Sequence, residues 1–206
     1  MELRQAIADL AEVRGRLANV QRFDGVSGNA AIASGVVALL AGAVQAATVP
    51  HPDSAAGCRT YISIWLTCLG LALAVNYGAI VAWRLRNRGV QAGVQFRTVG
   101  MSILPAIAAG GVITLALVLR GLSDLLPGMW CATYALGLFA SRAMVPPNVV
   151  LVAVAFGVVA AALLLVPTIQ PLTWWVMPAA FGLGQIAIGA IVRADPSHER
   201  LSLIHI

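Results

Sequence analysis

Apolar residues along this chain gather into six long stretches that contain no Asp, Glu, Lys, Arg or His, and the charged residues lie almost entirely between them. A helix needs about 20 apolar residues to cross about 30 Å of hydrocarbon. The pattern therefore predicts an all-α fold, a polytopic membrane bundle with six transmembrane helices. We expect these helices at residues 30–48, 61–83, 100–119, 125–140, 149–166 and 173–191.

The composition favours lipid as the solvent of these stretches. Mean hydropathy is +0.88, and charged residues make up only 10% of the chain, whereas soluble domains carry about 25%. With 206 residues, the chain has no room for a second large domain. We expect a cytosolic amphipathic helix and turn at 1–28, a six-helix transmembrane domain at 29–193 and a short tail at 194–206.

The arginines indicate how the bundle is oriented. All 13 basic residues are arginine, and the net charge is +5. If the N-terminus is cytoplasmic, only Arg59 and Arg120 fall outside. The arginines that fall inside are Arg4, Arg14, Arg16, Arg22, Arg84, Arg86, Arg88, Arg97, Arg142, Arg193 and Arg200. This asymmetry fits the positive-inside rule and predicts an N-in/C-in, multi-pass protein of a bacterial cytoplasmic (inner) membrane.

The positive charge by itself is also typical of nucleic-acid-binding proteins, but no helix-turn-helix or aromatic pattern accompanies the arginines. We therefore expect the lipid bilayer, through its anionic head groups, as the partner of these side chains, and no nucleic acid. The segment before the first apolar stretch carries Glu2, Asp9, Glu12 and Asp24. Because a cleaved leader is shorter and lacks such acidic residues, we expect the first helix to be retained.

A heptad pattern precedes the first apolar stretch. Apolar residues alternate at spacings of three and four, at Leu3, Ala6, Leu10, Val13, Leu17 and Val20. This spacing predicts an amphipathic helix with one apolar face. Two interpretations stay open: the helix packs on the protein's own cytosolic face or the head groups, or it binds a cytosolic protein or a second copy. The partner-binding face would then comprise Leu3, Leu10, Val13, Leu17 and Val20.

The last six residues, 201–206, do not resemble the rest of the chain. Their sequence, LSLIHI, is the translation of CTGTCTCTTATACACATC, the mosaic end of a transposase-based sequencing adapter. We therefore expect the tail to be truncated near Arg200 and its last residues to derive from the adapter. Residues of such an origin carry no information about the fold.

The apolar stretches lack the residues that most chemistry needs. They hold no His and no carboxylate, so serine-protease, metalloprotease, haem-ligating and proton-pumping arrangements have no candidate residues there. His51, Asp53 and Cys58 are too few for a metal site. Cys58 and Cys131 are expected near the same face, so a disulfide and two free thiols both stay open. We expect no enzyme activity, no cofactor and no metal.

A few polar residues do lie within the stretches, and the carboxamides matter most. Asn76 and Gln185 need hydrogen-bond partners in lipid, which neighbouring helices can supply. They either join helices or, together with Tyr77, line a site for a neutral solute. Tyr61, Trp130, Trp174 and Trp175 at one edge, with Trp83 at the other, are typical of an aromatic belt.

Small residues and one proline suggest how the helices pack. Residues at a spacing of four allow close helix approach, either inside the bundle or between copies. Such ladders occur in two stretches, at Ala30, Ser34, Ala38, Gly42 and Ala46, and at Ala153, Gly157 and Ala161. Pro105 lies within the third stretch, where it removes a backbone hydrogen bond and predicts a kink.

Four short motifs accompany this architecture: Arg14-Gly15, Arg22-Phe23-Asp24-Gly25, Leu126-Pro127-Gly128-Met129-Trp130 and Phe181-Gly182-Leu183-Gly184-Gln185. With these motifs, most of residues 3–193 resembles a set of uncharacterised six-helix bacterial integral membrane proteins. The resemblance implies the six-helix architecture and brings no known activity.

Two functions follow from these patterns. We expect a non-enzymatic integral membrane protein that recruits or senses a partner through its N-terminal helix, because a heptad stripe adjoins a bundle without reactive groups. The alternative is a small carrier or channel for neutral or apolar solutes, based on Pro105 and the carboxamides.

Overall fold

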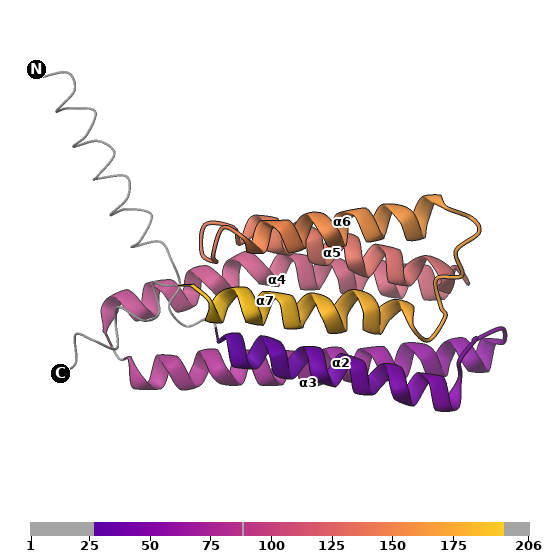
Figure 1. The fold of residues 1–206 in the computed structure, drawn as a ribbon, viewed down its shortest axis with the longest axis horizontal. Helices are drawn as coiled ribbons and strands as arrows, with labels where there is room; N and C mark the ends of the chain where they lie inside the picture. Colours follow the sequence, from indigo (N-terminus) through magenta and orange to yellow (C-terminus); the bar gives the residue numbers. More distant parts are fainter. Residues whose placement is uncertain (1–26, 88, 196–206) are drawn as a thin grey trace, which may run out of the picture.

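The computed structural model describes residues 27–87 and 89–195, which form helices joined by loops and turns and contain no strand (Figure 1). The α-helices of this part of the chain are α2 (Gly28–Thr48), α3 (Ala55–Arg86), α4 (Val90–Leu119), α5 (Leu126–Ala140), α6 (Val149–Leu165) and α7 (Leu183–Arg193). A 3₁₀ turn, Ser123–Leu125, precedes α5, and a π-helical turn, Pro178–Gly182, precedes α7. The predicted N-terminal helix and residues 201–206, which we expect to derive from an adapter, lie outside the described residues.

The all-α prediction is confirmed, and each of the six apolar stretches corresponds to a helix. Two helices are longer than predicted: α3 has 32 residues and α4 has 30, so at 1.5 Å per residue they are about 48 and 45 Å long. The sixth helix begins later than predicted, because residues 171–175 form turns and a bend. Pro105 lies inside α4, which continues through it.

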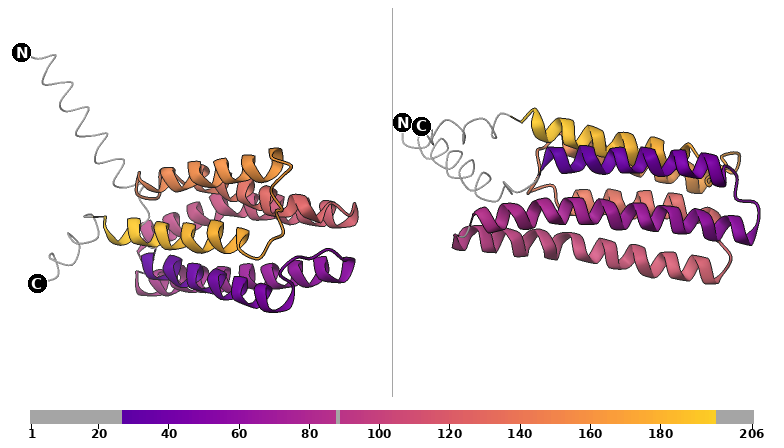
Figure 2. Two further views of the ribbon diagram at one scale, coloured as in Figure 1. Left: turned by 45° about the vertical axis from the view of Figure 1, so that its right-hand side comes forward. Right: turned by 90° about the horizontal axis from the view of Figure 1, so that it is seen from below.

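Consecutive helices run in opposite directions, so the bundle has two distinct ends (Figures 1 and 2). We call one the arginine-rich end: it holds the start of α2, the end of α7, and Arg84, Arg86, Arg142 and Arg193. Arg59 and Arg120 lie at the opposite end. Among the described residues, the fold thus places these two groups of arginines at opposite ends of the bundle.

Local sequence sets where several helices begin and end. Ser27 and Ser54 are N-caps whose hydroxyl oxygens accept hydrogen bonds from the backbone N–H groups of Ala30 and Gly57, at 3.2 and 3.1 Å. At the end of α4, Gly121 has a φ of +71°. The N–H of the next residue, Leu122, donates to the carbonyl of Leu117, as in a Schellman motif. Glycine is needed at Gly121 because other residues rarely adopt this φ.

A close helix contact joins α2 to α7 and to the π-helical turn that precedes α7. A Cβ on Gly35 would lie 2.7 Å from the carbonyl oxygen of Gly182, and a Cβ on Gly28 would lie 2.7 Å from that of Gly189. A Cβ on Gly42 would collide with the ring of Pro178. The three α2 glycines are seven residues apart, which is about two helical turns, so they line one face. Glycine on this face lets the two backbones touch.

The predicted ladder on α2 is buried at Ala30, Ser34, Ala38 and Gly42, and half-buried at Ala46. The backbone contact itself, however, uses the glycines at a spacing of seven, which the spacing-of-four pattern does not identify. On α6 the ladder lies only partly inside the bundle. Ala153 is buried, but Ala161 is exposed, and a Cβ on Gly157 would meet nothing within 4 Å.

The aromatic belt is also only partly as predicted. Trp174 and Trp175 are exposed. Tyr61 instead is fully buried, and its ring is stacked on that of Trp130 with centroids 6.4 Å apart. Tyr61 therefore belongs to the core, where it packs in one cluster with Ala38, Trp65 and Met177.

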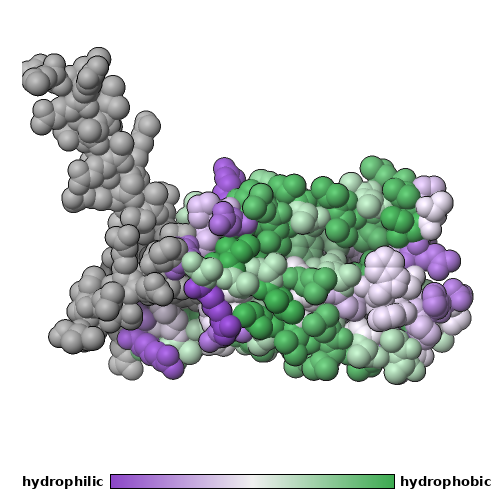
Figure 3. All heavy atoms as spheres, in the orientation of Figure 1, coloured by the Kyte–Doolittle hydropathy of each residue, from purple (hydrophilic) through white to green (hydrophobic). Residues whose placement is uncertain are grey.

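Large apolar side chains cover the outer surface of the bundle between its two ends (Figure 3). Every helix from α2 to α7 contributes residues that are more than half exposed; examples are Leu40, Leu71, Val112, Leu136, Val158 and Leu183. Among the described residues, α2 and α3 are long and apolar enough to cross a membrane. Shorter apolar helices cover 104–119, 149–165 and 178–193.

The glycine contact predicts that the same substitution, glycine to alanine, changes stability in opposite directions at two positions. Gly35→Ala places a methyl group against α7, and we expect a loss of about 1–3 kcal/mol of stability from overpacking. Gly78→Ala adds the same methyl group where nothing lies within 4 Å, and alanine is the better helix former by about 1 kcal/mol. Thermal unfolding of purified protein should therefore show a lower Tm for Gly35→Ala and an equal or higher Tm for Gly78→Ala. Equal shifts at both positions would contradict the contact.

Candidate functional site: polar contacts in the bundle interior

Gln45 forms the most deeply buried polar contact. Its side chain is 0% exposed. Its Nε2 donates a hydrogen bond of 2.8 Å to the carbonyl oxygen of Leu172, and its Oε1 accepts one of 2.8 Å from Nε1 of Trp65. One carboxamide thus joins α2, α3 and the connection between α6 and α7, with its nitrogen and its oxygen each bonded.

A second polar pair joins α2 to α3 nearer the arginine-rich end. Asn76 Nδ2 donates hydrogen bonds to Ser34 Oγ at 2.7 Å and to the carbonyl oxygen of Ala72 at 2.9 Å. Ser34 Oγ in turn donates to the carbonyl oxygen of Ala30 at 2.9 Å, and Ser34 is buried. A buried amide without partners is costly, so the pair fixes how the two helices are rotated against each other.

The third pair joins α5 to α7. Gln185 Nε2 donates a hydrogen bond of 2.7 Å to the hydroxyl oxygen of Tyr134. The ring of Tyr134 packs edge-on against Phe156, with centroids 4.7 Å apart, and lies 5.3 Å from Phe181. Gly184 leaves room for the Phe156 ring, because a Cβ there would come within 2.6 Å of it. The hydrogen bond and the aromatic cluster hold α5, α6 and α7 together.

The α4–α5 contact has its own polar pair, next to an unpaired hydroxyl. Trp130 Nε1 donates a hydrogen bond of 2.8 Å to Thr114 Oγ1, which donates to the carbonyl oxygen of Gly110 at 2.6 Å. The hydroxyl of Tyr61, whose ring is stacked on Trp130, has no hydrogen-bond partner among the described residues. A buried polar group without a partner destabilises the fold.

The structure separates the predicted site residues. Asn76 and Gln185 take part in different pairs, and no hydrogen bond within the described residues joins them. The half-buried Tyr77 takes part in neither pair. Each carboxamide instead has a partner on a neighbouring helix. Gln45, Ser34 and Tyr134 belong to the same kind of contact, and the only sequence signal for them is that they are polar residues within apolar stretches.

The weak metal candidates lie in the connection between α2 and α3, which holds His51 and Asp53, and at the start of α3, which holds Cys58. No group of three or more His, Cys, Asp or Glu side chains occurs within residues 27–87 and 89–195, so His51, Asp53 and Cys58 do not form one. Cys58 and Cys131 are free thiols, and Cys131 is buried while Cys58 is half-buried. The Sγ of Cys58 donates to the carbonyl oxygen of Pro52 at 3.4 Å.

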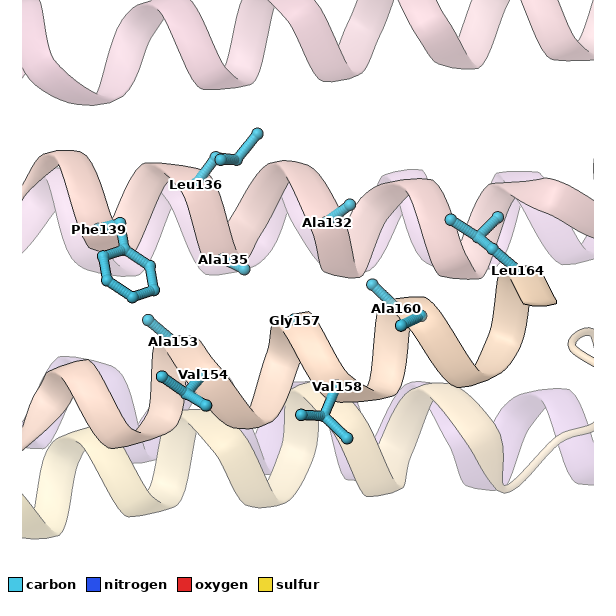
Figure 4. Close-up of a pocket in the computed structure, with 11 residues that line it drawn as sticks. Ala132, Ala135, Leu136, Phe139, Ala153, Val154, Gly157, Val158, Ala160 and Leu164 are labelled. Carbon is cyan, nitrogen blue, oxygen red and sulfur yellow. The ribbon is translucent and has the colours of Figure 1, made fainter. Parts of the chain in front are cut away.

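An apolar groove of about 610 Å³ runs along the junction of α5 and α6 (Figure 4). Its lining consists of Ala, Gly, Val, Leu and Phe side chains only. The small residues in it are Ala132, Ala135, Ala153, Gly157, Ala160 and Ala161. The groove faces the outside of the bundle, because Leu136 and Val158, which also line it, are 68% and 63% exposed.

No protein-family model, curated protein or solved structure matches this chain. The resemblance to six-helix bacterial membrane proteins therefore stays a prediction. Function has to be argued from the residues and the fold.

Removing the hydroxyl group at each of two tyrosines tests the hydrogen bond between Tyr134 and Gln185. Tyr134→Phe removes a hydroxyl that is hydrogen-bonded and should lower stability, whereas Tyr61→Phe removes one that is unpaired and should be neutral or stabilising. A double-mutant cycle of Tyr134→Phe with Gln185→Ala should give a coupling energy of about 0.6–2 kcal/mol. The measurement is thermal or denaturant unfolding in detergent.

A different outcome would favour the solute-site interpretation. If Ala at Gln185 and Asn76 leaves unfolding unchanged but alters solute flux in proteoliposomes, these side chains line a path rather than join helices.

Proposed function

We propose that this chain is an integral membrane protein whose six-helix bundle spans the bilayer. The observation that carries the proposal is the distribution of apolar side chains. Large apolar residues are exposed on every described α-helix, while the α2–α7 contact is built from glycine and other small residues. Soluble proteins rarely expose apolar patches of such extent. In lipid, by contrast, small residues inside and large apolar residues outside are the expected arrangement.

The charges support one orientation of the bundle. In our proposal the arginine-rich end faces the cytoplasm of a bacterial cell and the end with Arg59 and Arg120 faces outward, following the positive-inside rule. The six helices would all cross the membrane. The shortest, α7, has 11 residues and is extended by the π-helical turn Pro178–Gly182. The next shortest, α5, has 15 residues, about 22 Å of helix, and spans with the help of the 3₁₀ turn at Ser123–Leu125 and local thinning of the bilayer.

Cysteine labelling tests both parts of this proposal. In a Cys58→Ser background, Asp53→Cys and Asn87→Cys place exposed thiols at opposite ends of the bundle, while the two remaining cysteines are buried. A membrane-impermeant maleimide should label Asp53→Cys in intact cells and Asn87→Cys only after permeabilisation. The protein should also stay in the membrane pellet after alkaline carbonate washing. Release by carbonate, or labelling of both positions in intact cells, would contradict the proposal.

We further propose that the bundle is a non-enzymatic platform that presents the N-terminal segment to a cytosolic partner. The interior supports this view, because the carboxamides of Gln45, Asn76 and Gln185 all have hydrogen-bond partners within the bundle. The start of α2, which follows the N-terminal segment in the chain, is also held in place by hydrogen bonds. Asn29, at the start of α2, accepts hydrogen bonds from the guanidinium of Arg193 at the end of α7, next to the Gly28–Gly189 contact.

A charge-matched pair of variants tests the role of the heptad stripe. Leu10→Glu with Leu17→Glu places two carboxylates on the predicted apolar face, whereas Ala11→Glu with Ala18→Glu adds the same charges one position off it. Cross-linking in native membranes followed by mass spectrometry should recover a partner, or a second copy, with the wild type and the control but not with the first variant. Membrane insertion should be equal in all three. Equal recovery from both variants would refute recruitment through this face.

A further inference from the structure

The groove between α5 and α6 is shaped for a flexible chain rather than a helix. Neighbouring packed helices are about 8–10 Å apart, whereas a helix with its side chains is about 10–12 Å wide. A second helix that lay along the α5–α6 junction would therefore be too wide to enter the groove. It would rest on the exposed side chains of Leu136 and Val158 and would not reach Gly157, which lies between them. A hydrocarbon chain is narrow enough to fill the hollow.

The groove also has a definite length and direction. On α6 it extends from Ala153 near the arginine-rich end to Leu164, a rise of about 16 Å. The hydrocarbon core of a bilayer is about 30 Å thick, so the groove spans roughly the depth of one leaflet. A lipid whose head group lies at the arginine-rich end would have its acyl chain alongside the groove.

A positively charged side chain, that of Arg142, lies at that end of the groove. Phe139 lines the groove, and Arg142 Nη1 donates a hydrogen bond of 3.1 Å to the carbonyl oxygen of Phe139. This contact holds the exposed guanidinium at the level where a lipid phosphate would lie. The N-terminus of α6, which begins at Val149 close by in the chain, adds positive potential.

From these observations we infer that the α5–α6 groove is a binding site for an anionic phospholipid, with one acyl chain against Gly157 and the phosphate at Arg142. The inference rests on the proposed placement of the bundle in a membrane. The leaflet at the arginine-rich end is the expected source, because the cytoplasmic leaflet carries anionic lipids. The apolar lining supplies no selectivity between head groups, so the preference for an anionic one comes from Arg142.

Native mass spectrometry of the full chain in a mild detergent tests the site. The protein is incubated with equal amounts of phosphatidylglycerol and phosphatidylcholine that carry the same acyl chains. We expect the first bound lipid to be phosphatidylglycerol by about fivefold, the preference that one arginine near a head group provides. Arg142→Gln should bring this ratio close to one, while Arg120→Gln, at the opposite end, should leave it unchanged.

A second pair of variants tests the groove itself. Gly157→Leu fills the hollow and should remove the first bound lipid of either kind. Gly70→Leu is the matched control: it adds the same side chain at another glycine whose Cβ would meet nothing within 4 Å, away from the groove. If Gly157→Leu fails to fold, Ala161→Leu narrows the groove at an exposed position.

Several results would overturn the inference: no preference for phosphatidylglycerol in the wild type, an unchanged ratio in Arg142→Gln, or full lipid retention in Gly157→Leu. Loss of a dimer in Gly157→Leu with unchanged lipid binding would assign the groove to a second copy instead. None of these results bears on the membrane placement, which carbonate washing and cysteine labelling test separately.

Discussion

The contact between the glycine faces of α2 and α7 is the constraint on which the rest of the packing depends. These two helices lie at opposite ends of the described chain, and their contact closes the bundle. In the membrane that we propose as its setting, no hydrophobic force presses helices together, so close van der Waals approach has to supply the attraction. Gly28, Gly35 and Gly42 allow it, because a Cβ at any of these positions would lie within 3 Å of an atom of α7 or of the π-helical turn before it. The remaining helices pack outward from this pair, α3 against α2 and the α5–α6 pair against α7.

Polar side chains then fix the rotation of each helix about its axis. Gln45 joins α2, α3 and the α6–α7 connection, and Gln185 joins α7 to α5. Each such group would be costly if it faced an apolar environment alone. The pairs therefore select one rotation of each helix in a bundle whose helices are otherwise apolar on all faces between the two ends. Because these groups have partners in the structure, we place the proposed functions at the arginine-rich end and at the outer face rather than in the interior.

The two proposals concern different parts of the bundle, the α2–α7 pair and the α5–α6 junction. A firmly closed α2–α7 pair suits the presentation of the segment that precedes α2, since Asn29 and Arg193 join the two helices at that end. The α5–α6 junction is less completely filled, and its hollow faces outward beside Arg142. A lipid held there would lie on the same side of the membrane as the N-terminal segment.

The sequence by itself determined the all-α fold, the approximate positions of the six helices and the separation of the described arginines, because apolar length and charge are local properties. Only the tertiary structure decided that Tyr61 is buried against Trp130, that Asn76 pairs with Ser34, and that Gly157 faces a groove. The reason is physical. A helix in water shows its inward face by an apolar stripe, but in these helices both faces are apolar, so the sequence gives little indication of which residues turn inward. That choice depends on small residues and hydrogen bonds from helices distant in the chain.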